Sequence, residues 1–215
     1  MKLLNIQKLG LNLSDLSQVP SQLDAANVAF NAIDTVNWAE FPYKPTAEFR
    51  MVATPEGLVI NYRVKEGSVA AVAPADCGNV WEDACVEFFS SPADDGYYYN
   101  VECNCAGTIL IAVGKDRHVR ERAPKEVLEA VKRWSSLGRE PFAERVGECE
   151  WQVVLLIPYG TYFKHDFKTL DGMTIRANFY KCGDKLQTPH FLSWNPIEVK
   201  EPDFHRPEWF GELNF

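Results

Sequence analysis

The sequence EFRMVATPEGLVINYRV, residues 48–64, contains two apolar-rich runs separated by Pro55-Glu56-Gly57. In the second run every other residue is apolar or aromatic, beginning with Leu58 and ending with Val64. Successive side chains of a strand point to opposite sides, so this alternation is typical of a strand with one buried face. Proline and glycine between the runs favour a reversal of the chain. Residues 48–64 are therefore predicted to form a β-hairpin.

Further strand-like runs occur along the rest of the chain. They occupy residues 84–90, 97–104, 107–113, 150–158, 173–182 and 190–194. Turn-forming sequences such as SPADDG at residues 91–96 separate them, and residues 66–80, rich in Ala, Gly and Pro, are expected to form a loop. About nine short strands divided by such turns are typical of an all-β protein, a two-sheet antiparallel β-sandwich.

Three segments fall outside this strand pattern. In residues 124–137 apolar side chains recur at helical spacing, which predicts one short amphipathic helix. Residues 1–37 are irregular and are expected to wrap around the sandwich as an N-terminal segment. The tail, residues 202–215, is rich in aromatic residues and is expected to dock onto the sandwich. The whole chain, residues 1–215, is thus expected to form a single domain.

Charge and hydropathy limit the classes of partner. The chain has 22 Lys and Arg against 30 Asp and Glu, and an acidic protein repels nucleic-acid phosphates unless it carries a basic patch. The densest basic stretch, residues 115–122, also contains acidic residues and is expected to be mixed surface. No run approaches the roughly 20 apolar residues of a membrane helix, so no membrane partner is expected. The N-terminus lacks signal-peptide features, which favours a cytoplasmic location, or a secreted or periplasmic one if a signal precedes residue 1.

The common cofactor and metal motifs are not found in the sequence. GxGxxG, P-loop, HExxH and GxSxG patterns are absent, and the four histidines are dispersed. Of the six cysteines only Cys103 and Cys105 are close in sequence, and no second pair or nearby histidine completes a zinc set. Both are therefore expected to be packing thiols. No cofactor and no metal ligand are predicted from these patterns.

Two tryptophans suggest a ligand site. Trp81 follows a loop and precedes acidic residues, and Trp194 stands at the end of a predicted strand. Indole rings pack on the apolar C–H faces of sugars, while charged and amide groups bond the hydroxyls. Glu87, Arg176 and Asn178 are candidates for those bonds, since Arg176 and Asn178 share one strand face. Each tryptophan taken alone fits the hydrophobic core at least as well.

A pair of carboxylates offers a catalytic alternative. Glu87 and Glu102 belong to runs that are expected to neighbour each other, and glycosidases use two carboxyl groups about 5 Å or about 6.5–9.5 Å apart across one cleft. The sequence supplies no such distance. The other interpretation is that both are outward-facing strand carboxylates with no catalytic role.

Several runs, taken in order, carry a resemblance to a known family. They are VWEDACVEFF (80–89), YYNVECN (98–104) with Gly107, Trp151 before Ile157-Pro158, RANFYKC (176–182), HFLSW (190–194), and FHRPE (204–208) with Phe210-Gly211. In this order they resemble carbohydrate-binding family 9-like domains, which are common in gut-type Bacteroidetes and related to family 9 carbohydrate-binding modules and the wider DOMON-like sandwiches. The resemblance covers nearly the whole chain.

The resemblance implies an antiparallel sandwich with a non-catalytic role and a mono- or oligosaccharide ligand. In family 9 modules two tryptophans sandwich a terminal sugar, and a carboxylate downstream of the first bonds its hydroxyls. The matching positions are Trp81, Trp194 and Glu87, whereas Arg176 and Asn178 are inferred from strand position. Such modules are appended to polysaccharide hydrolases, so a glycoside hydrolase is the implied protein partner.

Some residues depart from the family pattern and keep alternatives open. Phe191 stands three residues before Trp194, where an amide is expected in a sugar-binding module. A sandwich with a decayed sugar site would serve protein interaction, and a haem-binding variant would use His190 as its axial ligand. Family 9 modules also carry structural calcium, for which Asp94 and Asp95 are the loop candidates, although calcium takes six to eight oxygen ligands.

Overall fold

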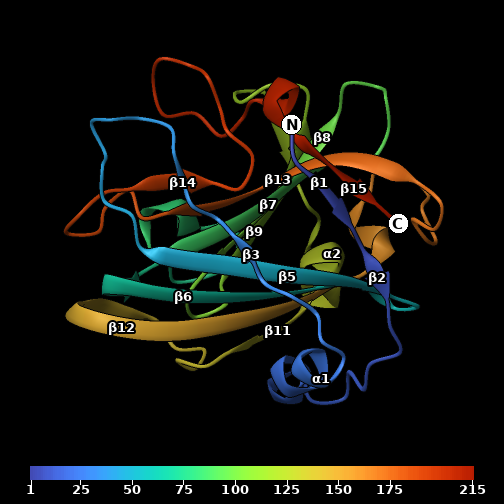
Figure 1. Cartoon of the computed structure of the whole chain (residues 1–215), viewed down its shortest axis with the longest axis horizontal. Helices are drawn as coiled ribbons and strands as arrows, with labels where there is room; N and C mark the ends of the chain where they lie inside the picture. The colour runs from blue at the N-terminus through green and yellow to red at the C-terminus, as the bar shows by residue number, and fades with distance from the viewer.

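The predicted hairpin lies at the centre of the smaller of two sheets. In the computed structural model, which describes residues 1–215, its strands are β5 (Thr46–Thr54) and β6 (Gly57–Ala71). The order of this sheet is β11 (Lys132–Ser135), β12 (Phe142–Ile157), β6, β5 and β2 (Gln7–Lys8), and β3 (Asn31–Ala32) also pairs with β5. We call it the hairpin sheet; it forms the lower layer in Figure 1.

The larger sheet lies above the hairpin sheet in Figure 1 and contains nine strands. Its main order is β1 (Leu3–Asn5), β15 (Gly211–Asn214), β13 (Thr174–Cys182), β7 (Cys85–Ser91), β8 (Tyr98–Asn104), β9 (Ile109–Gly114) and β10 (Arg120–Arg122). Two further strands, β14 (Phe191–Ser193) and β4 (Thr35–Val36), extend from β13. We call it the large sheet. The predicted β-sandwich is thus confirmed, with two short parallel pairings, β1 with β15 and β2 with β5.

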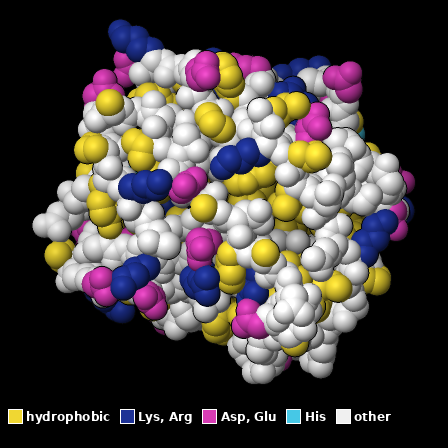
Figure 2. All heavy atoms as spheres, viewed as in Figure 1, with side chains coloured by type: hydrophobic (Ala, Val, Ile, Leu, Met, Phe, Trp, Pro, Cys, Tyr) yellow, Lys and Arg dark blue, Asp and Glu magenta, His cyan; other side chains and the backbone are white.

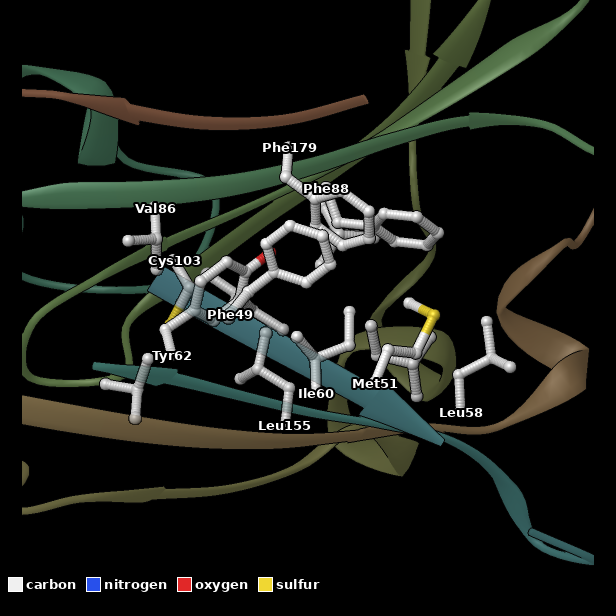
Figure 3. Close-up of a cluster of buried hydrophobic side chains, with 14 of the residues drawn as sticks. Phe49, Met51, Leu58, Ile60, Tyr62, Val86, Phe88, Cys103, Leu155 and Phe179 are labelled. Carbon is white, nitrogen blue, oxygen red and sulfur yellow. The ribbon is translucent and has the colours of Figure 1, made fainter. Parts of the chain in front are cut away.

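The main core fills the space between the two sheets. Phe49 of β5 stacks on Phe179 of β13 with ring centroids 3.5 Å apart, and Phe179 in turn stacks on Phe88 of β7 (Figure 3). Aliphatic side chains of the hairpin, among them Leu58 and Ile60, continue this cluster. Each such burial stabilises the fold by about 1.5–3 kcal/mol, which explains why alternating apolar residues fix the register of these strands.

Smaller apolar clusters cover the outer faces of both sheets. Helix α1 (Val19–Ala25) covers the outer face of the hairpin sheet, where its Val19 and Leu23 are fully buried against Val52 and Val59. The N-terminal segment thus contributes this helix and short strands of both sheets. The docked tail contributes β15 and, with Phe204 and Phe210, part of the cluster on the outer face of the large sheet. None of the helices has the length and apolar character needed to cross a membrane.

Two local predictions were wrong. The helix expected over residues 124–137 ends early, because α2 spans only Lys125–Ala130 and residues 132–135 pair with the edge of β12 instead. Residues 66–71, expected in a loop, extend β6, because the first half of β12 provides them with a pairing partner. In both places pairing with β12 supplies hydrogen bonds that the local pattern does not reveal.

Four short 3-10 turns complete the chain at Leu16–Gln18, Val80–Glu82, Tyr159–Thr161 and Pro207–Trp209. Charged side chains of both signs are interspersed with small apolar groups on the face shown in Figure 2. Exposed ion pairs such as Arg63 with Glu48 accompany this mixture. Such surface pairs contribute little to stability, so the fold rests on its buried clusters.

Candidate ligand-binding pocket

A cavity of about 370 Å³ lies on the outer face of the large sheet. Its floor comes from outward-facing side chains of β7, β8, β9, β10 and β13, because strand alternation sends residues such as Asn100 and Glu102 outward while Tyr99 and Val101 enter the core. Loops form its walls. The lining residues are Trp81, Glu87, Phe89, Asn100, Glu102, Leu110, Ala112, Arg117, His118, Arg120, Arg122, Cys182, Asp184, Phe191, Pro202, Asp203, Phe204 and His205.

Two buried glutamates form the acidic part of the floor. Glu87 and Glu102 are directly opposite each other on β7 and β8 and are 3% and 5% exposed. Asn100 Nδ2 donates to Glu102 Oε1 at 2.8 Å, whereas the other oxygen, Oε2, has no hydrogen-bond partner. Burial raises the pKa of Glu102 to about 7, and burial together with the Glu102 charge raises the pKa of Glu87 well above its ordinary value. Both carboxyl groups therefore keep their protons to a higher pH than exposed glutamates do.

A basic wall stands beside the glutamates. Arg120 donates from Nε and Nη2 to Asn100 Oδ1, at 3.0 and 2.6 Å, and its guanidinium lies over the ring of Tyr98. Its position is thereby fixed. Arg122 and Arg117 are more exposed and lie toward the solvent, and Arg117 pairs with Asp203 at 3.5 Å. This wall therefore offers the pocket one guanidinium held by Asn100 and two that are exposed to solvent.

Aromatic rings and a neutral histidine form the remaining wall. Trp81 and Phe191 are partly buried, and Phe204 stacks on Tyr180 with ring centroids 4.1 Å apart. His205 shares a hydrogen bond of 3.0 Å with the hydroxyl of Tyr98. Burial and the nearby arginine charges lower the pKa of His205 to about 3, so the ring is neutral at neutral pH. Apolar faces thus stand opposite buried polar groups, the usual composition of a small-molecule site.

The structure brings together only some of the residues that were predicted for the site. Trp81 and Glu87 line the pocket. Trp194 is 4% exposed and lies in the core between the sheets, edge-on to Phe49 and Phe179. The two tryptophans therefore do not face each other across the pocket, and the aromatic ring that β14 presents to it is that of Phe191.

Arg176 and Asn178 also lie outside the pocket lining. Asn178 is fully buried, and its amide bonds the backbone of Asn195 in both directions, which holds the turn after β14. Arg176 donates to the backbone oxygens of Pro207 and Glu208 and so ties the tail to β13. Their side chains share the outer face of β13, as predicted, but they serve the structure of neighbouring segments.

The other sequence candidates have local partners. His190 is fully buried and lies 2.8 Å from Lys181 Nζ, away from the pocket lining. Asp95 accepts from the backbone of Tyr97 and contacts His165 Nε2 at 3.1 Å. Cys103 and Cys105 are buried, and both belong to the main core cluster.

Sequence reasoning missed the basic and histidine walls. Residues 115–122, interpreted as mixed surface, supply Arg117, Arg120 and Arg122, and the tail supplies His205. One signal was available, because Arg120 and Arg122 are two residues apart and would share a face if they belonged to a strand. The pairing of β10 with β9, which places that face beside Glu102, is a tertiary feature.

Comparison with known proteins agrees with this fold. The sequence profile of carbohydrate-binding family 9 matches residues 17–215, and the chain therefore belongs to this family, whose members are typically non-catalytic carbohydrate-binding modules. The family assignment confirms the resemblance found in the sequence.

Solved structures show the same architecture. A protein from Bacteroides uniformis, proposed to bind carbohydrate, is 53% identical and superposes with a TM-score of 0.96 over 100% of this chain and 99% of its own. A family 9 module from Caldicellulosiruptor kristjanssonii was solved with glucose, and it matches at 11% identity and a TM-score of 0.57 over 99% of this chain and 95% of its own. The same kind of module with cellotriose gives 11% identity and a TM-score of 0.56 over 99% and 93%. These two show likeness of fold.

Proposed function

We propose that the protein binds a mono- or oligosaccharide in the pocket on the outer face of the large sheet, without cleaving it. The observation that carries the proposal is the meeting of an aromatic wall containing Trp81 with the buried polar floor of Glu87, Asn100 and Glu102. Family membership supports it, as do the glucose and cellotriose complexes of the Caldicellulosiruptor module.

The polar floor contains a hydrogen-bond acceptor that has no partner in the protein and could accept from a sugar hydroxyl. A buried carboxylate oxygen without a partner costs about 1–3 kcal/mol, and Glu102 Oε2 is such an atom. A hydroxyl of the ligand would donate to it, and the guanidinium of Arg122 would donate to ring or hydroxyl oxygens at the rim. In this proposal Trp81 stacks on one face of the sugar, with Phe191 and Phe204 completing the apolar wall.

Binding is proposed rather than hydrolysis because the two glutamate side chains lie on the same face of the sheet. Glu87 and Glu102 stand side by side on one sheet face, in adjacent strands. Glycosidases place their two carboxyl groups on either side of the scissile bond, with one above and one below the reacting sugar carbon. Two carboxyl groups on one floor can both bond to one edge of a sugar, but they do not lie on either side of a scissile bond.

Titration calorimetry and tryptophan fluorescence with a panel of neutral and acidic mono- and oligosaccharides test the proposal. We expect saturable binding of one sugar class with millimolar to micromolar affinity. Trp81→Ala and Glu102→Gln should each abolish it, whereas Trp134→Phe, on the outer face of the hairpin sheet, should bind like the wild type. A flat response of the wild type across the panel, or sugar turnover that Glu87→Gln abolishes, would overturn it.

A further inference from the structure

Two cysteines stand opposite each other at one end of the pocket floor. Cys85 of β7 and Cys182 of β13 are direct partners in the antiparallel register of these strands, and both are free thiols. Glu87 follows Cys85 by two residues, so strand alternation places it on the same outer face. Three metal-ligating groups from two adjacent strands thus share one position beneath the cavity.

The three donor atoms are spaced as ligands of one ion would be. The sulfur atoms of Cys85 and Cys182 and a carboxylate oxygen of Glu87 all lie within 4.8 Å of one another. Cys182 Sγ donates to Glu87 Oε1 at 3.1 Å. Zinc bonds of about 2.3 Å to sulfur and about 2.1 Å to oxygen place tetrahedral ligands about 3.5 Å apart, so small side-chain movements suffice.

A second observation concerns the surroundings of this set. Cys182 and Glu87 line the cavity, so an ion has a path from solvent. Glu102, directly opposite Glu87, is 5% exposed and has the unpartnered oxygen Oε2. An oxygen placed there can accept a hydrogen bond from a water molecule bound to the ion, as carboxylates around metal ligands commonly do.

We propose that Cys85, Cys182 and Glu87 form a binding site for a thiophilic divalent cation such as Zn²⁺, with the fourth position of the tetrahedron open to the cavity. Two sulfurs and one oxygen are a donor set that favours Zn²⁺ over Ca²⁺ or Mg²⁺. On binding, both thiol protons, and the Glu87 proton where present, leave to solvent, and the three anionic ligands exceed the ion's charge by one. Arg120 and Arg122 supply positive charge from the basic wall of the same cavity. The site does not depend on sugar binding.

The test uses the full chain, freed of metal by a chelator and kept reduced with a phosphine. Zn²⁺ is titrated by calorimetry, and Co²⁺ by absorption spectroscopy, because thiolate ligands give a charge-transfer band and tetrahedral Co²⁺ gives intense visible bands. We expect one ion per chain and both sets of Co²⁺ bands. Cys85→Ser and Cys182→Ser should each remove the charge-transfer intensity of one thiolate and weaken Zn²⁺ binding at least tenfold.

Matched controls separate the site from general thiol binding and from loss of fold. Cys77→Ser and Cys149→Ser change the two half-buried cysteines outside the site and should bind Zn²⁺ like the wild type. Zn²⁺ should raise the Tm of the wild type and of these controls, but not that of Cys182→Ser, whose folding is checked by circular dichroism. Absence of a cobalt–thiolate band in the wild type, or Zn²⁺ binding unchanged in both site variants, would refute the proposal.

Discussion

Glu87 and Glu102 face each other across β7 and β8 with both side chains buried beneath the pocket. Like charges in directly opposite positions destabilise a sheet, and burial adds the cost of removing each charge from water. Protonation relieves both costs. The pocket floor is therefore a place where the stability of the fold and its ability to bind ligand depend on pH.

The first prediction concerns the pH dependence of stability. Glu102 has a higher pKa in the folded protein, about 7, than its ordinary value of 4.5, so the folded state binds more protons between these values and stability falls as pH rises through them. Across the window the loss is about 3 kcal/mol. In Glu102→Gln, which still accepts from Asn100, the loss should be smaller, because Glu87, whose pKa burial also raises, is then the only carboxyl of the pair that loses a proton. Urea unfolding below pH 4.5 and above pH 7 measures the difference.

The two buried histidines have the opposite effect on the pH dependence of stability, because they make the fold more stable as pH rises. The pKa values of His190 and His205 are lowered to about 3 from 6.5, so they stabilise the fold above pH 6.5 and that stability is lost as pH falls toward 3. They are present in both proteins, so they cancel in the comparison of Glu102→Gln with wild type. Parallel pH profiles for the two proteins would contradict the role assigned to Glu102.

Arg120 is expected to be a positioning residue of the pocket. It holds the side-chain oxygen of Asn100, and Asn100 in turn donates to Glu102. Arg120→Lys keeps the charge but loses the two-nitrogen contact with Asn100, so we expect a loss of about 1–3 kcal/mol in stability and about tenfold in sugar affinity. Calorimetry and urea unfolding measure the two effects. Arg122→Lys, which also keeps its charge but lies at the exposed rim, is the control for stability, and unchanged stability and affinity in Arg120→Lys would show that charge alone matters.

The sequence predicts those parts of the fold that depend on local alternation. The hairpin of β5 and β6 and the run from β7 to β9 follow from apolar residues at every second position, and the tail's aromatic residues predict its docking. Residues 132–135 illustrate the limit, since their pairing with β12 overrides a helical spacing. A strand's partner is chosen by distant residues and is not visible in its own pattern.

The candidate site was predictable only in part, because local sequence patterns do not show which strands lie side by side. Trp81 and Glu87 line the cavity, and both were predicted from the family resemblance. Trp194 was placed wrongly with respect to the pocket because a tryptophan at a strand end has a similar sequence context whether it faces solvent or core. The arginines of β10 could not be assigned to the site from the sequence, because they come close to Glu102 only through the pairing of β10 with β9.

A further prediction separates the two tryptophans. Trp194 packs on Phe49 and Phe179, and its ring also contacts the backbone at Gly211, where an added Cβ would lie 2.6 Å from the ring. Trp194→Ala should therefore lower the free energy of unfolding by about 3–5 kcal/mol while leaving the sugar affinity of the folded fraction unchanged. Trp81→Ala should abolish sugar binding while leaving the free energy of unfolding nearly unchanged. Urea unfolding combined with calorimetry distinguishes them, and loss of sugar binding in a folded Trp194→Phe variant would contradict this division.

The last prediction concerns a buried polar cluster between the sheets. Lys181 of β13 forms an ion pair of 2.9 Å with Glu66 of β6, both side chains being fully buried, and Trp151 Nε1 donates to the other oxygen of Glu66 at 2.7 Å. His190 lies against Lys181 and stays neutral, because burial and the lysine charge lower its pKa to about 3.

Removing one partner of this pair leaves the other charged and buried. Lys181→Met should therefore cost about 3–5 kcal/mol of unfolding free energy, and Glu66→Gln a similar amount. The double variant should cost clearly less than the sum, because it leaves no unpaired charge and Gln still accepts from Trp151. Urea unfolding of all four proteins gives the coupling energy, and additive losses would mean that the two side chains do not stabilise each other. Since this cluster faces the core and the proposed sugar pocket lies on the outer face of the same sheet, sugar affinity should be unchanged in each variant that folds.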